Sequence, residues 1–238
     1  MKKMFIWIFD KLGFELTVNR KGRVRYISCK ETVEKANAAN LSVCDYVEKL
    51  WHQEGSTELV INNIMTVIKK DDIESVCEIG PGTGRYIEHI IKRLPTLGNY
   101  CIYELDSQWA QWLENTYKVK RQPTEGNNLK YENNNIHDLI HAHGVFVTLN
   151  LYNVFEYLNE MIRATKTNGY IVFDYYNESS FSDEIASILL EEKVTYPVII
   201  PEKIIKNFIS IKKCKIISEF ENKHGKGISK YIILQKNE

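Results

Sequence analysis

Three glycines at every second position constrain this chain more than any other feature. Residues 74–86 read ESVCEIGPGTGRY, in which Gly80, Gly82 and Gly84 follow a short apolar stretch. Because glycine has no Cβ, the backbone of such a loop can turn sharply and approach a ligand closely. The apolar stretch predicts a buried strand, and the residues after the loop predict a helix. We therefore expect this loop at the carboxyl edge of a parallel sheet, where open α/β sheets bind ligands.

The order of the predicted elements extends this pattern along the chain. From residue 74 onward, short apolar segments alternate with amphipathic ones, which predicts a mostly parallel sheet with helices on both faces. The predicted strands are SVCEI, YCIYEL, VKRQP, a part of IHDLIHAHGVF, and YIVFDYY. The predicted helices are GRYIEHIIKRL, SQWAQWLENTY, NLYNVFEYLNEMIRATK, IASILLEE and PEKIIKNFI. The fold class is therefore α/β.

Several helix and strand ends carry their own signals. Asp106 or Ser107 is expected to cap the second of these helices, and Asn168-Gly169 to end the third. Pro201 is expected at the first position of the last helix. The closing segments KCKIISEF and ISKYIILQK, joined by ENKHGKG, predict a hairpin that places one antiparallel strand in the sheet.

The first 70 residues have a different pattern and are predicted to form a cap on the domain of residues 71–238. FELTVNRKGRVRYI alternates around a turn signal and predicts a hairpin. SVCDYVEKLW predicts a helix in which Ser42 is the N-cap and Asp45 completes a capping box. A further helix is expected between Leu59 and Ile68. The cap helix carries three side chains that either close over a ligand or pack in its own core: Tyr46, Trp51 and His52.

The composition narrows the class of partner. Lys+Arg and Asp+Glu are both 31, and a chain without net positive charge is not expected to bind nucleic acid through bulk charge. No run of 18 apolar residues predicts a membrane-spanning helix, and the apolar residues 4–9 are too short for a signal peptide. They are expected to pack against the body of the protein, and a weak membrane contact through Phe5, Trp7 and Ile8 is the alternative. We expect a cytoplasmic protein with a small-molecule substrate and no stable membrane insertion, and the sequence leaves the oligomeric state open.

The cysteines indicate a reducing environment. They form no CxxC pair and no cluster with zinc-ligand spacing, so they are expected to be small buried hydrophobes. The five cysteines are Cys29, Cys44, Cys77, Cys101 and Cys214.

The spacing of the glycines distinguishes between two classes of cofactor. Dinucleotide enzymes use GxGxxG, and this chain has Arg85 where the third glycine of that pattern belongs. The pattern present is E-x-G-x-G-x-G, which resembles motif I of the class I S-adenosylmethionine (SAM)-dependent methyltransferases. The resemblance implies SAM as cofactor. Because SAM carries an ammonium and a sulfonium group, an acid at the strand end, Glu78, suits such a ligand. A plain tight turn without a ligand is the alternative.

The resemblance covers about residues 74–238 and implies a set of cofactor-binding residues. Glu104, at the end of the second strand, would accept hydrogen bonds from the ribose hydroxyls, and Leu105 would pack on the adenine. Glu125-Gly126 would lie near the adenine amino group, although the family prefers aspartate there. The full implied set is Glu78, Gly80, Pro81, Gly82, Gly84, Glu104, Leu105, Glu125, Gly126 and His141. The family also implies the Rossmann-like strand order 3-2-1-4-5-7-6, with strand 7 antiparallel.

The fourth strand carries the candidate catalytic residues. His141 and His143 follow each other at i, i+2, so an extended backbone would place both on one face. The resemblance implies that residues at the carboxyl end of this strand lie beside the transferred methyl group. Histidine transfers protons near neutral pH, and either residue is a candidate base for an alcohol acceptor. Structural packing is the alternative. A metal site that adds His137 and Asp138 is disfavoured because a strand places those two on opposite faces, and no metal is predicted.

Two further sequence features concern the molecule that accepts the methyl group. Asp174, Tyr175 and Tyr176 end the fifth strand and either line a substrate pocket or pack there. The hairpin segment 20–25 concentrates four basic residues, which form either a solvated turn or a contact for an anionic substrate.

The whole chain, including the cap helix SVCDYVEKLW, is similar to bacterial methyltransferases that accompany surface-polysaccharide synthesis enzymes. This similarity implies O-methylation of a sugar or of a phosphoramidate-type group in a capsular polysaccharide. The alternatives are a methyltransferase of another small molecule, a non-catalytic SAM-fold binding subunit and a nicotinamide-dependent oxidoreductase.

Overall fold

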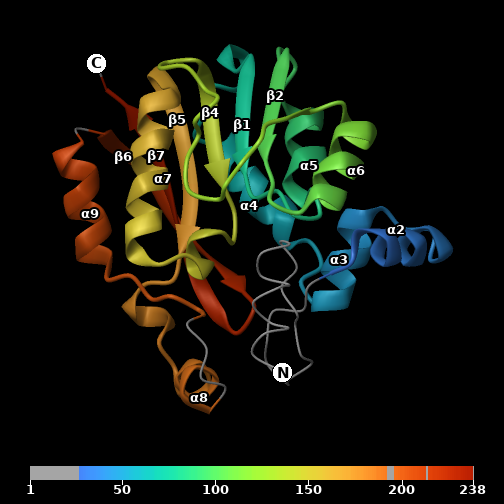
Figure 1. The fold of residues 1–238 in the computed structure, drawn as a ribbon. Coiled ribbons are helices and arrows are strands. Elements are labelled where there is room, and N and C mark those ends of the chain that lie inside the picture. The colour runs from blue at the N-terminus through green and yellow to red at the C-terminus, as the bar shows by residue number, and fades with distance from the viewer. Residues whose placement is uncertain (1–26, 192–195, 213, 238) are drawn as a thin grey trace, which may run out of the picture.

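The protein is built around one seven-stranded sheet with the order β3-β2-β1-β4-β5-β7-β6 (Figure 1). A computed structural model describes residues 27–191, 196–212 and 214–237. The strands from β3 to β5 are parallel, and β7 runs antiparallel to both of its neighbours. The strand bounds are β1 Ser75–Ile79, β2 Asn99–Tyr103, β3 Lys120–Arg121, β4 His137–Ala142, β5 Thr165–Tyr175, β6 Cys214–His224 and β7 Gly227–Lys236. The predicted α/β class and strand order are confirmed.

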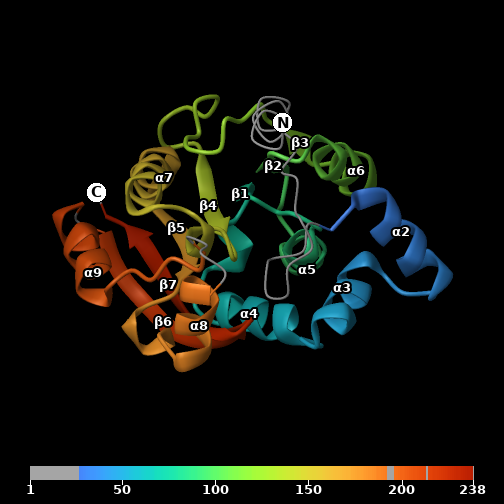
Figure 2. The same cartoon turned by 60° about the horizontal axis from the view of Figure 1, so that its bottom comes forward.

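Helices cover both faces of this sheet, as Figures 1 and 2 show. α4, α5 and α6 pack on one face, and α7 and α9 pack on the other. The helix bounds are α2 Cys29–Ala38, α3 Val43–Trp51, α4 Ser56–Met65, α5 Arg85–Arg93, α6 Ser107–Tyr117, α7 Leu151–Ala164, α8 Asp183–Glu191 and α9 Glu202–Ile211. Within the described residues, short 3-10 helices span Lys70–Asp72, Phe146–Thr148 and Glu178–Ser180. Among the described residues, no helix is both long enough and apolar enough to cross a membrane.

The central strand β1 explains why the glycine loop lies where it does. All five of its residues are buried, because both faces of a parallel sheet are covered. Cys77 and Ile79 face α7, and Val76 faces α4 and α5. The chain leaves the sheet at Gly80, whose N–H donates to the carbonyl oxygen of Tyr103 at 2.8 Å and so extends the pairing with β2.

The end of α7 differs from the prediction. The helix ends at Ala164, and β5 begins at Thr165, so Asn168-Gly169 lies inside the strand and does not end the helix. The N–H of Ile136 donates to the Ala164 carbonyl at 2.8 Å, and Thr165 is already the partner of His137 in β4. These contacts with β4 stop the helix early, and the register of β4 against β5 shifts just beyond them.

Smaller differences concern the last elements. Pro201 is the N-cap of α9 and so stands one residue before the predicted position. β6 continues to His224, so the hairpin turn is shorter than the predicted ENKHGKG loop. The predicted N-caps Ser42 and Asp106 are confirmed, since the Ser42 side chain accepts from the Asp45 N–H and the Asp106 carboxylate accepts from two N–H groups of α6.

The segment before β1 contributes to two cores. α2 and α3 pack with Trp109 of α6 in a small separate cluster. α4 instead shares the core formed by α5 and the sheet. The division at residue 70 stays a prediction. The predicted hairpin 14–27, apart from its last residue, the basic segment 20–25 and the apolar residues 4–9 lie outside the described residues.

Candidate active site

The glycine loop lies at the carboxyl edge of the sheet, and its three glycines are required for two different reasons. All three have a positive φ, at 61° for Gly80, 53° for Gly82 and 77° for Gly84. A Cβ on Gly80 would lie 2.7 Å from Val145 Cγ2, and one on Gly84 would lie 2.3 Å from Leu113 Cδ2. A Cβ on Gly82 would meet nothing within 4 Å. Gly80 and Gly84 therefore serve close packing, whereas the backbone of Gly82 faces open space.

The predicted ribose-binding acid lies against this loop. Glu104 Oε2 accepts from the Gly82 N–H at 2.8 Å, and Oε1 accepts from the Asp106 N–H at 2.8 Å. Burial raises the pKa of Glu104, and these backbone hydrogen bonds oppose the rise. The end of β2 and the glycine loop after β1 thus converge on one carboxylate.

The residues predicted to meet an adenine lie beside that carboxylate. Leu105 is a large apolar residue with 66% of its surface exposed. A Cβ on Gly126 would lie 2.9 Å from Leu105 Cδ1, so the loop after β3 folds over this side chain. Glu125 is exposed on the same loop. Leu105 beside Gly126 thus forms an apolar surface next to the Glu104 carboxylate.

Glu78 is placed deeper than its position at the strand end suggests. It is 1% exposed, and the Tyr100 hydroxyl donates to its Oε2 at 2.6 Å. Burial raises the pKa of Glu78 to about 8; the Tyr100 hydrogen bond lowers it and the charge of Glu104 raises it. The carboxyl group is therefore mostly neutral at pH 7, and a nearby cation would favour its ionised form.

The two histidines of the fourth strand share one face, as the i, i+2 spacing predicts. Their ring centroids are 5.0 Å apart, and the His143 ring stacks on Tyr86 at 3.7 Å. His141 Nε2 lies 3.0 Å from the Tyr100 hydroxyl. Burial lowers the pKa of His141 to about 3 and that of His143 well below its ordinary value. Both are buried neutral rings, and their roles in catalysis and cofactor binding stay predictions.

The four residues of the disfavoured metal set do not come together. His137 Nε2 lies 2.8 Å from Glu132 Oε2, on the face covered by α7, while His141 contacts Tyr100 on the opposite face. The register shift that follows His137 explains this separation, because it changes which residues of β4 share a face. Asp138 instead accepts from the Ser75 N–H at 2.9 Å.

A histidine and an aspartate lie close together at the same edge of the sheet, and the sequence did not predict this pair. Asp174, near the end of β5, is 1% exposed, and its Oδ1 accepts from the Gly144 N–H at 2.6 Å. Its Oδ2 accepts from the Ser229 hydroxyl at 2.6 Å and lies 3.5 Å from His224 Nδ1. A Cβ on Gly144 would lie 2.5 Å from His224 Cε1, so this ring rests on the loop that follows β4.

Sequence reasoning named Asp174 as a possible pocket residue but missed His224. The two are far apart in the chain and meet only because β7 pairs with both β5 and β6. The neighbouring Tyr175 and Tyr176 are buried, with exposures of 0% and 2%. No local signal marks His224, which the sequence places in a turn segment.

α3 reaches the same region from the N-terminal side. The Trp51 ring lies 4.8 Å from the Arg85 Cζ atom, and Arg85 directly follows the glycine loop. Tyr46 packs partly in the α2–α3 cluster, whereas His52 is exposed. Among the three predicted cap residues, Trp51 thus contacts Arg85, the first residue of α5.

Comparisons with known folds agree with this architecture. The structure resembles the magnesium protoporphyrin IX methyltransferase from Synechocystis with bound S-adenosylhomocysteine (SAH), with a TM-score of 0.60, 11% identity and 100% of each chain covered. It also resembles the N-methyltransferase NodS from Bradyrhizobium japonicum in complex with SAH, with a TM-score of 0.57, 11% identity, and 76% of this chain and 87% of that chain covered.

A third neighbour is a putative sarcosine dimethylglycine methyltransferase from Galdieria sulphuraria. Its TM-score is 0.59 at 11% identity, with 76% of this chain and 85% of that chain covered. No curated protein matches the sequence. A family model described as a methyltransferase domain matches residues 38–213, which is most of the chain. On this match, the protein belongs to the methyltransferase-domain family.

Proposed function

We propose that this protein is a SAM-dependent O-methyltransferase of a small molecule. The observation that carries the proposal is the hydrogen bond between Glu104 and the Gly82 N–H, which joins an acid and a bare glycine backbone at the carboxyl edge of the sheet. Two structural neighbours are described with SAH bound. Family membership supports methyl transfer as the reaction class.

The residues at this edge fit SAM on three counts. The backbone of Gly82 faces open space, so a ligand can approach it. Glu104 offers a carboxylate for ribose hydroxyls, and the exposed Leu105 beside Gly126 offers an apolar surface for a base. When bound, SAM supplies an electrophilic methyl group on a sulfonium. The chain must orient the acceptor against that group, and such positioning supplies much of the rate.

An oxygen acceptor is supported by the pair His224–Asp174. Asp174 is buried and held by Gly144 and Ser229, and it faces the Nδ1 of His224, which is partly exposed. An aspartate in this position orients an imidazole. The other ring nitrogen, Nε2, is then available to take a proton from an acceptor hydroxyl. His224 is our candidate base, because it is partly exposed, whereas burial lowers the pKa of His141 and of His143 and so makes both rings weak bases.

For the acceptor we propose a sugar or phosphoramidate-type group of a capsular or other surface polysaccharide. The support is the resemblance of the chain to methyltransferases of that kind. An anionic acceptor is further supported by Arg85, which follows the glycine loop, and by the basic segment 20–25. The surface-polysaccharide assignment fails if neither sugar nucleotides nor phosphoramidates are methylated while another hydroxyl compound is.

We expect SAM and SAH, but not NAD, to raise the melting temperature of the protein. A ligand at 100 times its dissociation constant stabilises the folded state by about 2.7 kcal/mol. Differential scanning fluorimetry with each ligand separately measures this. A shift with NAD alone would support a nicotinamide-dependent oxidoreductase. Binding of SAM without turnover of any acceptor would support a non-catalytic binding subunit.

The His224→Gln variant is expected to lose about 100-fold in kcat, with the affinity for SAM unchanged, because a positioned base contributes on that order. Release of SAH with a panel of sugar nucleotides and phosphoramidates measures the rate. The pH dependence that an imidazole base imposes should also flatten in this variant. Lys223→Gln, at the exposed neighbouring position of β6, is the matched control and should keep the wild-type rate. An unchanged rate in His224→Gln, together with a lower rate in His141→Gln, would indicate that His141 is the base.

A further inference from the structure

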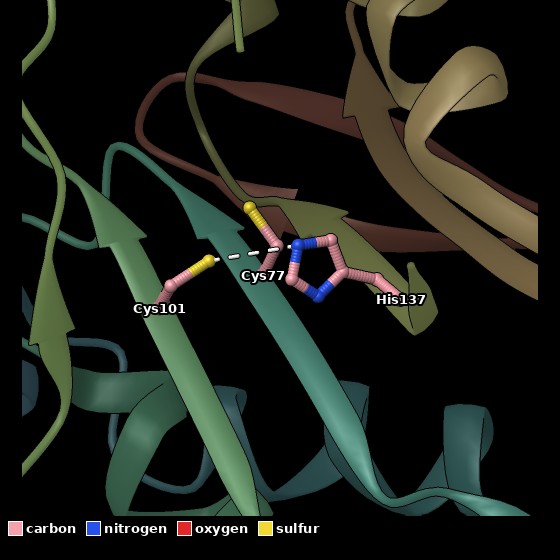
Figure 3. Close-up of side chains that lie close together, drawn as sticks. All are labelled: Cys77, Cys101 and His137. Carbon is pink, nitrogen blue, oxygen red and sulfur yellow. Dashed lines mark hydrogen bonds between the residues drawn. The ribbon is translucent and has the colours of Figure 1, made fainter. Parts of the chain in front are cut away.

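A cluster of metal-ligating side chains lies on the other face of the sheet, away from the proposed active site. The ligand atoms of Cys77, Cys101 and His137 all lie within 4.8 Å of one another. The three residues come from β1, β2 and β4, and Figure 3 shows their side chains converging on one point. All three are buried, with exposures of 0%, 1% and 0%. Cys77 and Cys101 are register partners in adjacent strands.

A fourth donor, from a carboxylate, lies beside two of these three ligands. Glu132, from the segment between β3 and β4, has its Oε2 2.8 Å from His137 Nε2 and its Oε1 3.6 Å from Cys101 Sγ. Cys101 Sγ and His137 Nε2 are 3.8 Å apart. Zinc binds thiolate sulfur at about 2.3 Å and imidazole nitrogen at about 2.0 Å in tetrahedral geometry, so ligand atoms about 3–4 Å apart suit it.

The surrounding hydrogen bonds orient these donors toward a common centre. His137 Nδ1 lies 2.8 Å from Ser75 Oγ, which accepts from the Asn99 amide at 3.2 Å and leaves Nε2 facing the thiols. Glu132 Oε1 accepts from the Gln122 amide at 2.7 Å and from the Tyr103 hydroxyl at 3.1 Å, which leaves Oε2 directed at His137. Such outer partners are typical of metal-ligating histidines and carboxylates.

We propose that Cys77, Cys101, His137 and Glu132 form a closed structural site for Zn²⁺. The mixed sulfur, nitrogen and oxygen donors favour zinc over magnesium or calcium, which prefer oxygen alone. Binding releases the two thiol protons and the proton that His137 Nε2 shares with Glu132, and no electron is transferred. The ion ties β1, β2 and β4 together beneath the glycine loop. The site is independent of the proposed methyl transfer.

The test uses Co²⁺ as a spectroscopic probe in the full chain. Protein stripped with a chelator and refolded with Co²⁺ should bind one equivalent, with the thiolate-to-cobalt charge-transfer band and the intense visible bands of a tetrahedral site. Zn²⁺ should displace the cobalt and abolish both. The Cys77→Ser and Cys101→Ser variants should each lose the charge-transfer intensity. Cys44→Ser is the matched control, because Cys44 lies 3.6 Å from His89 Nε2 in a separate cysteine–histidine contact, and it should keep the spectrum.

A second measurement keeps the proposal testable if a variant folds poorly. The melting temperature of the wild type should rise with Zn²⁺ and fall again with chelator, and the circular dichroism of each serine variant shows whether it is folded. Three results would overturn the proposal: no cobalt spectrum in the refolded wild type, a spectrum that survives in both serine variants, or a native mass showing a Cys77–Cys101 disulfide in place of bound metal.

Discussion

The free energy of unfolding of the Gly84→Ala variant is expected to be about 3 kcal/mol lower than that of the wild type. A Cβ at this position would lie 2.3 Å from Leu113 Cδ2 and 3.4 Å from Tyr117 Cε2, in a core where Leu113 is fully buried. The φ of 77° adds a penalty of about 1–2 kcal/mol for any residue with a side chain. Overpacking of a filled core costs about 1–3 kcal/mol more. Urea unfolding followed by circular dichroism measures the loss.

Two matched glycines separate strain from crowding and from ligand contact. Gly55 has a φ of 78° with nothing within 4 Å of a Cβ, so Gly55→Ala should show the strain alone, about 1–2 kcal/mol. Gly82→Ala should be equally mild in stability, yet on the proposed function it should weaken SAM binding, because its Cβ enters the ligand space. Equal stability of the Gly84→Ala and Gly55→Ala variants would show that α6 does not pack tightly on the loop.

Replacing Glu78 with glutamine is expected to stabilise the folded protein by about 3 kcal/mol at pH 7. The pKa of Glu78 is about 8 in the folded state and near 4.5 in the unfolded chain. Between these values the folded state holds a proton that the unfolded state has released. The free energy of unfolding of the wild type therefore falls as pH rises from about 4.5 to about 8, and the glutamine variant lacks this fall.

Urea unfolding at pH 5 and at pH 8 tests this expectation. The stability difference between Glu78→Gln and the wild type should be small at pH 5 and largest at pH 8. Glu221→Gln, at an exposed position of β6, should keep the wild-type pH dependence. Parallel curves for the wild type and Glu78→Gln would show that this carboxyl group titrates normally.

The Glu78→Gln substitution should weaken cofactor binding, although it stabilises the folded protein. A cationic ligand near Glu78 favours the carboxylate, so SAM binding by the wild type should strengthen as pH rises toward about 8. Glu78→Gln should bind at least about tenfold more weakly, without that pH dependence. Isothermal titration calorimetry at several pH values measures both. If binding is strong and pH-independent in both proteins, Glu78 has a structural role alone.

Local patterns predicted most of the fold. The buried strand before Gly80, the caps at Ser42 and Asp106, and the strand order followed from residues close together in the chain or from the family resemblance. The prediction failed at Asn168-Gly169, where a typical helix-ending pair lies inside β5. There the pairing of Thr165 with β4 outweighed the local signal. Element boundaries depend on such contacts, which the sequence does not display.

By itself the sequence determined that a glycine loop joins a buried strand to a helix and that Glu104 follows the next strand. Short-range periodicity marks the two strands, and parallel pairing brings their carboxyl ends to one edge of the sheet. Only the tertiary structure decided the rest. The register shift in β4 placed His137 with the thiols and His141 with Tyr100. Pairing of β7 with two strands brought His224 to Asp174. Contacts of this kind depend on register and burial, and a register change of one residue moves a side chain to the other face of the sheet.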